Sequence, residues 1–122
     1  MVLEVLKETF SVCKVKDYSC VDLNAKYCFT GKTDRERSLV CPSGDVPPNV
    51  LCRDDGWRCF RVKGTLEFSL TGILSGIASV LAEAKVPLFA VSTFDTDYVL
   101  VKETDLGSAL NVLTRAGYEI VR

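Results

Sequence analysis

The stretch "GTLEFSLTGILSGIASVLAEAKVPLFAVST", Gly64 to Thr93, decides the fold because the spacing of its apolar residues changes twice. Apolar and polar residues alternate over Gly64–Leu70, which indicates a half-buried strand. Over Thr71–Lys85 the apolar residues recur every three or four positions, as they do in an amphipathic helix. Pro87 disfavours helical geometry at the residue before it, so we expect the helix to end there and a second strand to follow over Pro87–Thr93.

The rest of the C-terminal half continues this alternation of strands and helices. Asp97–Lys102 reads as a third strand, and Leu106–Ala116 has an apolar helical face. Asp105 is a good N-cap for that helix, and Gly117 is the expected left-handed stop before a last strand, "YEIVR". The order β-α-β-β-α-β predicts an α+β fold of the ferredoxin-like type, with two helices on one face of a four-stranded antiparallel sheet.

The first half of the chain resembles a trimmed copy of the second. Strands are expected over Thr9–Val15 and Gly56–Val62. Between them, Tyr27–Cys41 is apolar, then polar, then apolar again, like the later hairpin, so that Thr33-Asp34 would correspond to Thr96-Asp97. No ordinary helix is expected in this half, because "KDYSCVDLNAK" is short and polar and "PSGDVPPNV" contains three prolines.

This likeness predicts two units, a degenerate N-terminal unit over residues 1–62 and a complete C-terminal unit over residues 63–122. The alternative is a single α+β domain with an irregular N-terminal extension.

Composition narrows the classes of partner. The chain has 122 residues and a formal net charge of −1, whereas nucleic acids and anionic membranes attract basic surfaces. No stretch approaches the roughly 20 apolar residues of a membrane-spanning helix. The N-terminus has acidic residues where a signal peptide needs a basic start. We therefore expect a cytoplasmic protein that binds neither nucleic acid nor membrane.

The cysteines suggest neither a metal site nor a catalytic thiol. There are six of them and no histidine, and no pair has the spacing of a zinc knuckle. Several lie in apolar, strand-like runs, which favours reduced and mostly buried thiols. The missing histidine excludes Ser-His-Asp and Cys-His catalysis, and there is no phosphate-binding glycine motif. The sequence therefore predicts no enzyme, no metal and no cofactor.

The C-terminal half resembles an ACT domain. The resemblance covers Gly64 to Ile120, and it depends on "SLTGIL" and "STFDTDYVLV" occurring together in this order. Small tandem-ACT proteins, amino-acid sensors and the regulatory domains of aspartate kinases belong to this family. The resemblance implies a regulatory or sensor protein that binds a small molecule, usually an amino acid. It also implies units that pair side by side, so a homodimer is expected.

In ACT domains that bind amino acids, the ligand contacts the loop before the first helix and the end of the second strand. The matching residues here are Ser69, Thr71, Gly72, Ile73, Ser92, Thr93, Phe94, Asp95, Thr96 and Asp97. At a helix N-terminus, backbone N–H groups and a partial positive charge suit a ligand carboxylate. Thr93, Thr96 and Asp97 would hold an amino group or a cationic side chain, with Phe94 shielding it or stacking on a guanidinium.

Each half of this site also has a purely structural interpretation. Gly72 is explained equally well by a strand that must turn into a helix. The polar residues around Phe94 are explained by a hairpin whose loop is capped by its own side chains.

The main alternative function is therefore an interaction or structural module with a vestigial ligand site. An RNA-binding domain shares the topology, but it needs exposed aromatic and basic residues on its central strands, a pattern that "RCFRVKG" and "GTLEFSL" match poorly.

Overall fold

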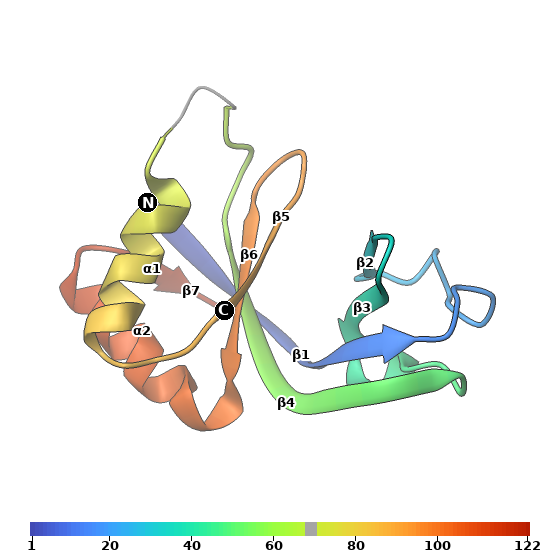
Figure 1. Ribbon diagram of the computed structural model, residues 1–122. Helices are drawn as coiled ribbons and strands as arrows, with labels where there is room; N and C mark the ends of the chain where they lie inside the picture. The colour runs from blue at the N-terminus through green and yellow to red at the C-terminus, as the bar shows by residue number, and fades with distance from the viewer. Residues whose placement is uncertain (68–70) are drawn as a thin grey trace. The chain divides into compact units, whose positions relative to one another are not determined.

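The computed structural model describes residues 1–67 and 71–122. The chain divides into two compact units. One consists of Met1–Lys7 and Arg58–Arg122, and we call it the helical unit; the other, Glu8–Trp57, we call the intervening unit. The expected boundary between residues 62 and 63 therefore differs from the observed division. Strands β1 (Val2–Val15) and β4 (Val50–Val62) run through both units (Figure 1).

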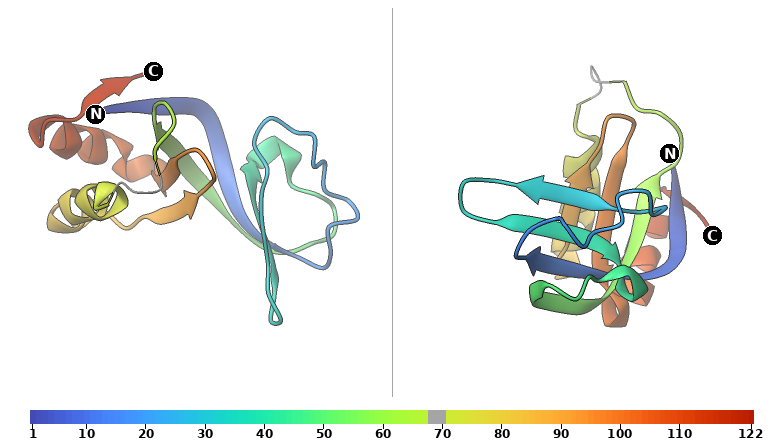
Figure 2. Two further views of the ribbon diagram at one scale, coloured as in Figure 1. Left: turned by 90° about the horizontal axis from the view of Figure 1, so that it is seen from above. Right: turned by 90° about the vertical axis from the view of Figure 1, so that its right-hand side faces the viewer.

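The helical unit has the predicted order of elements. After the end of β4 come α1 (Ile73–Glu83), β5 (Phe89–Ser92), β6 (Asp97–Lys102), the short 3-10 helix η2 (Glu103–Asp105), α2 (Leu106–Arg115) and β7 (Glu119–Val121). The two α-helices lie on the same side of these strands (Figure 2). The α+β, ferredoxin-like prediction of β-α-β-β-α-β is therefore confirmed.

The sheet of the helical unit differs from the expected one in its number of strands. Its described strands follow the order β7–β1–β4–β6–β5, so the N-terminal strand lies between β4 and β7. Strand β7 pairs with β1 in parallel, with Val2 opposite Glu119. The antiparallel, ferredoxin-like sheet is confirmed, but the four-strand prediction lacks β1, which is an additional strand and pairs with β7 in parallel. Leu3 and Val5 explain the insertion, because they alternate along β1 and are buried in the core of this unit.

The first strand of the β-α-β-β-α-β unit is the end of β4, and not the predicted Gly64–Leu70. Strand β4 ends at Val62, and Gly64 has a positive φ of 94°. Residues 65–67 are irregular, and the N–H of Leu66 donates to the carbonyl oxygen of Asp95 at 2.7 Å. The rest of the predicted strand, residues 68–70, lies outside the described residues.

Both helices lie where the spacing of their apolar residues predicts. The residues that begin and end them match the predictions only in part. Helix α1 stops at Glu83, before Pro87, because Lys85 takes a positive φ of 59°. Asp105 occupies the N-cap position of α2 without a side-chain hydrogen bond. Gly117 has a φ of 101°, which confirms the left-handed stop.

The core of the helical unit lies between the helices and the sheet. Its fully buried side chains come from every layer: Leu3, Phe60, Ile77, Leu81, Val99, Val101, Ala109 and Leu113. Each large apolar side chain in such a core contributes roughly 1.5–3 kcal/mol by leaving water. This core fixes α1 against the sheet and thereby positions the N-terminus of α1.

The intervening unit is a sheet without α-helices. Its strands follow the order β2–β3–β1–β4, with β2 at Phe29–Lys32 and β3 at Arg37–Pro42, followed by the 3-10 helix η1 at Ser43–Asp45. A small core contains Cys13, Val15, Leu39 and Cys41.

The two hairpins match with an offset of 60 positions. Phe29 begins β2 as Phe89 begins β5, and Thr33 begins one loop as Thr93 begins the other. The predicted match of Thr33-Asp34 with Thr96-Asp97 is therefore three positions out of register.

All six cysteines are free. Cys13, Cys41 and Cys59 are buried, Cys28 is half-buried, and Cys20 and Cys52 are exposed. The expectation of free thiols is confirmed, but only half of them are fully buried.

Across residues 1–67 and 71–122, no helix has both the length and the apolar character needed to cross a membrane.

Candidate functional site

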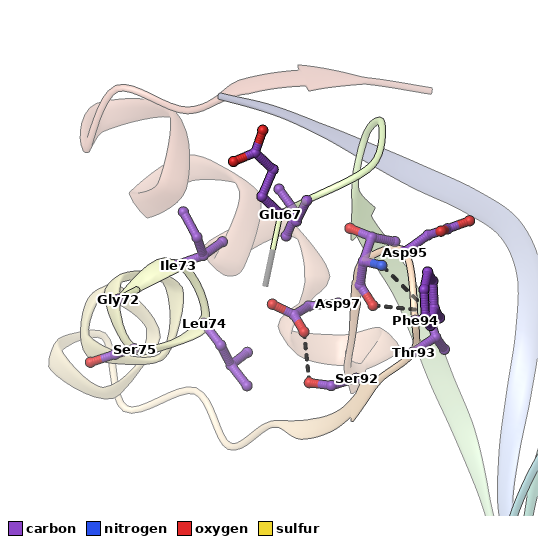
Figure 3. A pocket seen from close by; sticks show the side chains of 12 residues that line it. Glu67, Gly72, Ile73, Leu74, Ser75, Ser92, Thr93, Phe94, Asp95 and Asp97 are labelled. Atoms are coloured by element: carbon purple, nitrogen blue, oxygen red, sulfur yellow. Dashed lines mark hydrogen bonds between the residues drawn. The ribbon is translucent and has the colours of Figure 1, made fainter. Parts of the chain in front are cut away.

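An open pocket of about 370 Å³ lies between the start of α1 and the β5–β6 loop (Figure 3). Its described lining residues are Leu66, Glu67, Gly72, Ile73, Leu74, Ser75, Ser92, Thr93, Phe94, Asp95, Thr96 and Asp97. We call it the α1 pocket. All of these residues belong to the helical unit.

The structure brings most of the predicted site residues together here. Of the predicted residues, Thr71 is not part of the lining, and Ser69 lies outside the described residues. Four lining residues were missed by sequence reasoning: Leu66, Glu67, Leu74 and Ser75. Leu74 and Ser75 could have been predicted, because they lie in the first turn of the helix that begins at Ile73. Nothing in the sequence indicates Leu66 and Glu67 as pocket residues, because apolar and polar residues alternate around them as in a strand.

Gly72 sets the direction in which α1 enters the pocket. It is the N-cap residue, with a positive φ of 78°, and no side chain of a described residue caps this helix end. The first four N–H groups of a helix have no partner within the helix, and the helix dipole places partial positive charge there. A Cβ built on Gly72 would meet no atom of residues 1–67 or 71–122 within 4 Å, and the positive φ by itself favours glycine here. This supports the turn interpretation of Gly72 and leaves a positive helix end beside the pocket.

Two threonines hold the β5–β6 loop in shape. The N–H of Thr93 donates to the carbonyl oxygen of Thr96 at 2.9 Å, and the Thr93 hydroxyl donates to the same oxygen at 3.0 Å. Thr96 is buried, and its hydroxyl donates to the carbonyl oxygen of Val62 on β4 at 2.8 Å. Both hydroxyls are thus used in the architecture of the hairpin, as the self-capped interpretation predicts.

Asp97 is placed differently. Its carboxylate accepts a hydrogen bond from the Ser92 hydroxyl at 2.6 Å, and Figure 3 shows it on the side of the hairpin that faces α1. Phe94 points away from α1 in the same view, and 78% of it is exposed. A side chain this exposed does not enclose the pocket, so Phe94 lies at its rim.

The charge of the α1 pocket has one sign. Its described lining residues include three carboxylates, on Glu67, Asp95 and Asp97, and no lysine or arginine. The complementary ligand carries a positive group for these carboxylates, and a negative group suits the N-terminus of α1. Among the described residues, no group of three or more cysteine, aspartate or glutamate side chains is arranged to hold a metal ion.

The sequence of the chain matches the ACT domain over residues 53–115, about half of its length. The chain belongs to the ACT domain family. The match includes α1, β5, β6 and all of α2, and therefore the whole described lining of the α1 pocket.

Among curated proteins, this ACT chain is similar to subunit 1 of the cytosolic arginine sensor for mTORC1. The sensors of Homo sapiens and Bos taurus are each 42% identical to it over 60 residues, which cover 48% of this chain. The matched segment is 18% of the sensor, so the chain spans less than a fifth of that protein.

Solved structures share the fold over almost the whole ACT chain. A protein from Agobacterium tumefaciens is 30% identical with a TM-score of 0.85, covering 98% of this chain and 90% of its own. A protein of unknown function from Vibrio cholerae is 16% identical with a TM-score of 0.70, covering 93% and 88%. The aspartate kinase of Clostridium acetobutylicum is 13% identical with a TM-score of 0.67, covering 90% of this chain and 33% of its own.

Proposed function

We propose that this ACT protein is a regulatory or sensor protein that binds an amino acid in the α1 pocket. The observation that carries the proposal is the position of the Asp97 carboxylate on the side of the hairpin that faces α1, whose N-terminus has no side-chain cap from the part of the chain that the structure describes. An amino acid places its carboxylate on the helix end and its positive charge at Asp97. The protein acts by binding, without catalysis, in the cytoplasm.

The charge of the pocket favours an amino acid with a cationic side chain. An α-amino group and a second cation use three carboxylates more fully than an α-amino group alone. The similarity to a cytosolic arginine sensor agrees with this choice, so we propose arginine or a related basic amino acid as the ligand.

A thermal-shift panel of the twenty amino acids tests the ligand. Ligand in hundredfold excess over its Kd stabilises the folded state by about 2.7 kcal/mol, which raises the melting temperature. We expect the basic amino acids to give the largest shifts. A panel in which no amino acid shifts the melting temperature at millimolar concentration contradicts the proposal.

The Asp97→Asn variant tests the position of the ligand. It keeps the size of the side chain and removes its charge, so we expect binding of a basic amino acid to weaken by about 1.5–3 kcal/mol. Isothermal titration calorimetry measures the change. Asp34→Asn is the matched control, because Asp34 lies in the corresponding β2–β3 loop outside the pocket. Gly72→Val is a poorer test, because the positive φ of Gly72 strains any branched residue.

The second candidate function is an interaction module with a vestigial site. The hydrogen bonds of Thr93 and Thr96 favour it, because they explain part of the polar loop without a ligand. If Asp97→Asn lowers stability and leaves ligand binding unchanged, this function takes first place.

Two further expectations belong to the proposal. The intervening unit is a trimmed ACT repeat, since its order β2–β3–β1–β4 is that of a ferredoxin-like sheet without its helices. The protein forms homodimers, since the unpaired edges of strands are templates for pairing. Light scattering at micromolar concentration that detects only monomers contradicts the dimer.

A further inference from the structure

A second hollow, of about 330 Å³, lies beside the α1 pocket in the helical unit. It is lined by Glu4, Arg61, Val62, Lys63, Gly64, Thr65, Asp95, Thr96 and Tyr98. Asp95 and Thr96 line both hollows, so the β5–β6 loop separates them. Its side chains come from the neighbouring strands β1, β4 and β6 and from the turn after β4 (Figure 1).

Arg61 is held in place before any ligand arrives. Its Nε donates to Glu4 Oε1 at 3.0 Å, and one terminal nitrogen donates to the Tyr98 hydroxyl at 3.2 Å. Its guanidinium also lies 5.8 Å from the centre of the Tyr98 ring, a cation–π distance. Burial lowers the pKa of Arg61, but its bonds to Tyr98 and Glu4 outweigh burial and raise that pKa above the usual value. Arg61 is therefore a fixed and permanent positive charge.

Lys63 adds a second positive charge just after the strand. Strand β4 ends at Val62, and Lys63 lies in the bend that follows, where it lines the hollow together with Arg61. Lys63 is exposed, and its backbone N–H is fixed by a hydrogen bond of 2.9 Å to the Val2 carbonyl. Thr65 also lines the hollow, after the turn at Gly64.

The two hollows differ in the charged side chains that line them. The described lining of the α1 pocket has carboxylates only, whereas the second hollow contains both an arginine and a lysine. Glu4 is paired with Arg61 at 3.0 Å and Asp95 lies at the shared wall, so the hollow holds two carboxylates as well as two cations. A guanidinium, an ammonium and a hydroxyl are the groups that proteins use for oxyanions.

We propose that this hollow binds a small oxyanion, a carboxylate or a phosphate, between Arg61, Lys63 and Thr65. The site is distinct from the α1 pocket and does not depend on the amino-acid proposal. Because Asp95 lines both hollows, an anion in this hollow and a cation in the α1 pocket would lie on opposite sides of the β5–β6 loop.

Two-dimensional ¹H–¹⁵N NMR of the full chain at low ionic strength tests the proposal, with inorganic phosphate and succinate as separate probes. We expect saturable shifts centred on residues 61–65 with at least one probe, and the probe with the lower Kd identifies the oxyanion class. Lys63→Gln should weaken that binding on the order of tenfold, the effect of one charge-assisted hydrogen bond. Lys14→Gln, at an exposed lysine on β1 in the intervening unit, is the matched control and should leave it unchanged.

Three results overturn the inference: shifts that never saturate with either probe, equal losses in Lys63→Gln and Lys14→Gln, or shifts centred on Ile73–Ser75 in place of residues 61–65. Asp97→Asn separates the two proposals. It should leave phosphate or succinate binding unchanged, and a loss of binding in that variant also contradicts a separate site.

Discussion

The hairpins β2–β3 and β5–β6 have the same layout and different surroundings. Each has a four-residue loop in which a threonine N–H donates at 2.9 Å to a carbonyl three residues on, Thr33 to Glu36 and Thr93 to Thr96. Each second strand contains three consecutive buried residues, and each is followed by a 3-10 helix. The loop geometry is therefore a property of the hairpin, and of the two hairpins only the second belongs to a unit with α-helices.

The comparison separates architectural from site-specific residues. The first threonine of the loop occurs in both hairpins, so its presence needs no ligand. The residue after the loop is Arg37 in one and Asp97 in the other, an inversion of charge at the same register position. What distinguishes the second hairpin as a site is thus Asp97 and its Ser92 partner, and not the loop as a whole.

The largest expected effect tests whether the two units are separable. Phe60→Ala removes a fully buried ring from the helical unit and should cost about 3–5 kcal/mol. Urea unfolding followed by circular dichroism reports on the helices, and fluorescence of the single tryptophan, Trp57, reports on the intervening unit. Because β1 and β4 are continuous through both units, we expect both transitions to shift together. A tryptophan transition that does not move would show that the units unfold independently.

A smaller effect distinguishes corresponding loop positions. Thr96→Val removes the buried hydroxyl that donates to the Val62 carbonyl, which should cost about 1–3 kcal/mol. Glu36→Val, at the corresponding exposed position of the first hairpin, should change stability by less than about 0.5 kcal/mol. Urea midpoints measure both. Equal costs would mean that the second loop is not specially anchored to its sheet.

The two loop threonines should behave alike. Thr33 Oγ1 accepts hydrogen bonds from the N–H groups of Arg35 and Glu36, and Thr93 Oγ1 bonds within its own loop. Thr33→Ala and Thr93→Ala should each cost about 0.5–1.5 kcal/mol in urea unfolding. If only Thr93→Ala is costly, the common architecture of the hairpins is wrong.

The smallest effect at neutral pH concerns the thiols of the intervening unit. Burial raises the pKa of Cys41 to about 12, and burial also raises the pKa of Cys13. Because the folded pKa of Cys41 is above the ordinary thiol value, its contribution to stability is complete below about pH 9 and is lost as the pH rises toward 12. Ellman's reagent at pH 8 should label Cys20 and Cys52 rapidly and Cys41 only after unfolding. Rapid labelling of Cys41 in the folded protein would contradict this.

Sequence periodicity predicted the elements whose burial follows one regular face. Helix α2 and strand β6 lie where their apolar residues indicate, and Gly117 has the expected left-handed conformation. Most of the pocket residues were predicted because they lie at the ends of such elements. The predicted helix and strands already determine where those ends lie.

The remainder depended on long-range pairing, which a local pattern does not contain. Residues 64–67 alternate like a strand, yet the Leu66 N–H bonds the Asp95 carbonyl of a distant loop. The position of β1 between β4 and β7 could not be predicted either. The alternation of apolar and polar residues along a strand shows which of its faces is buried, but not which strands lie beside it. Glu67 was missed at the pocket for the same reason.

The pairing of β7 with β1 has a consequence for biosynthesis. Val2 lies opposite Glu119, and the Glu119 N–H donates to the Met1 carbonyl at 3.0 Å, so β7 closes on a strand that is synthesised long before it. The sheet of the helical unit cannot be completed until β7 has been synthesised, and until then β1 keeps an open edge on that side.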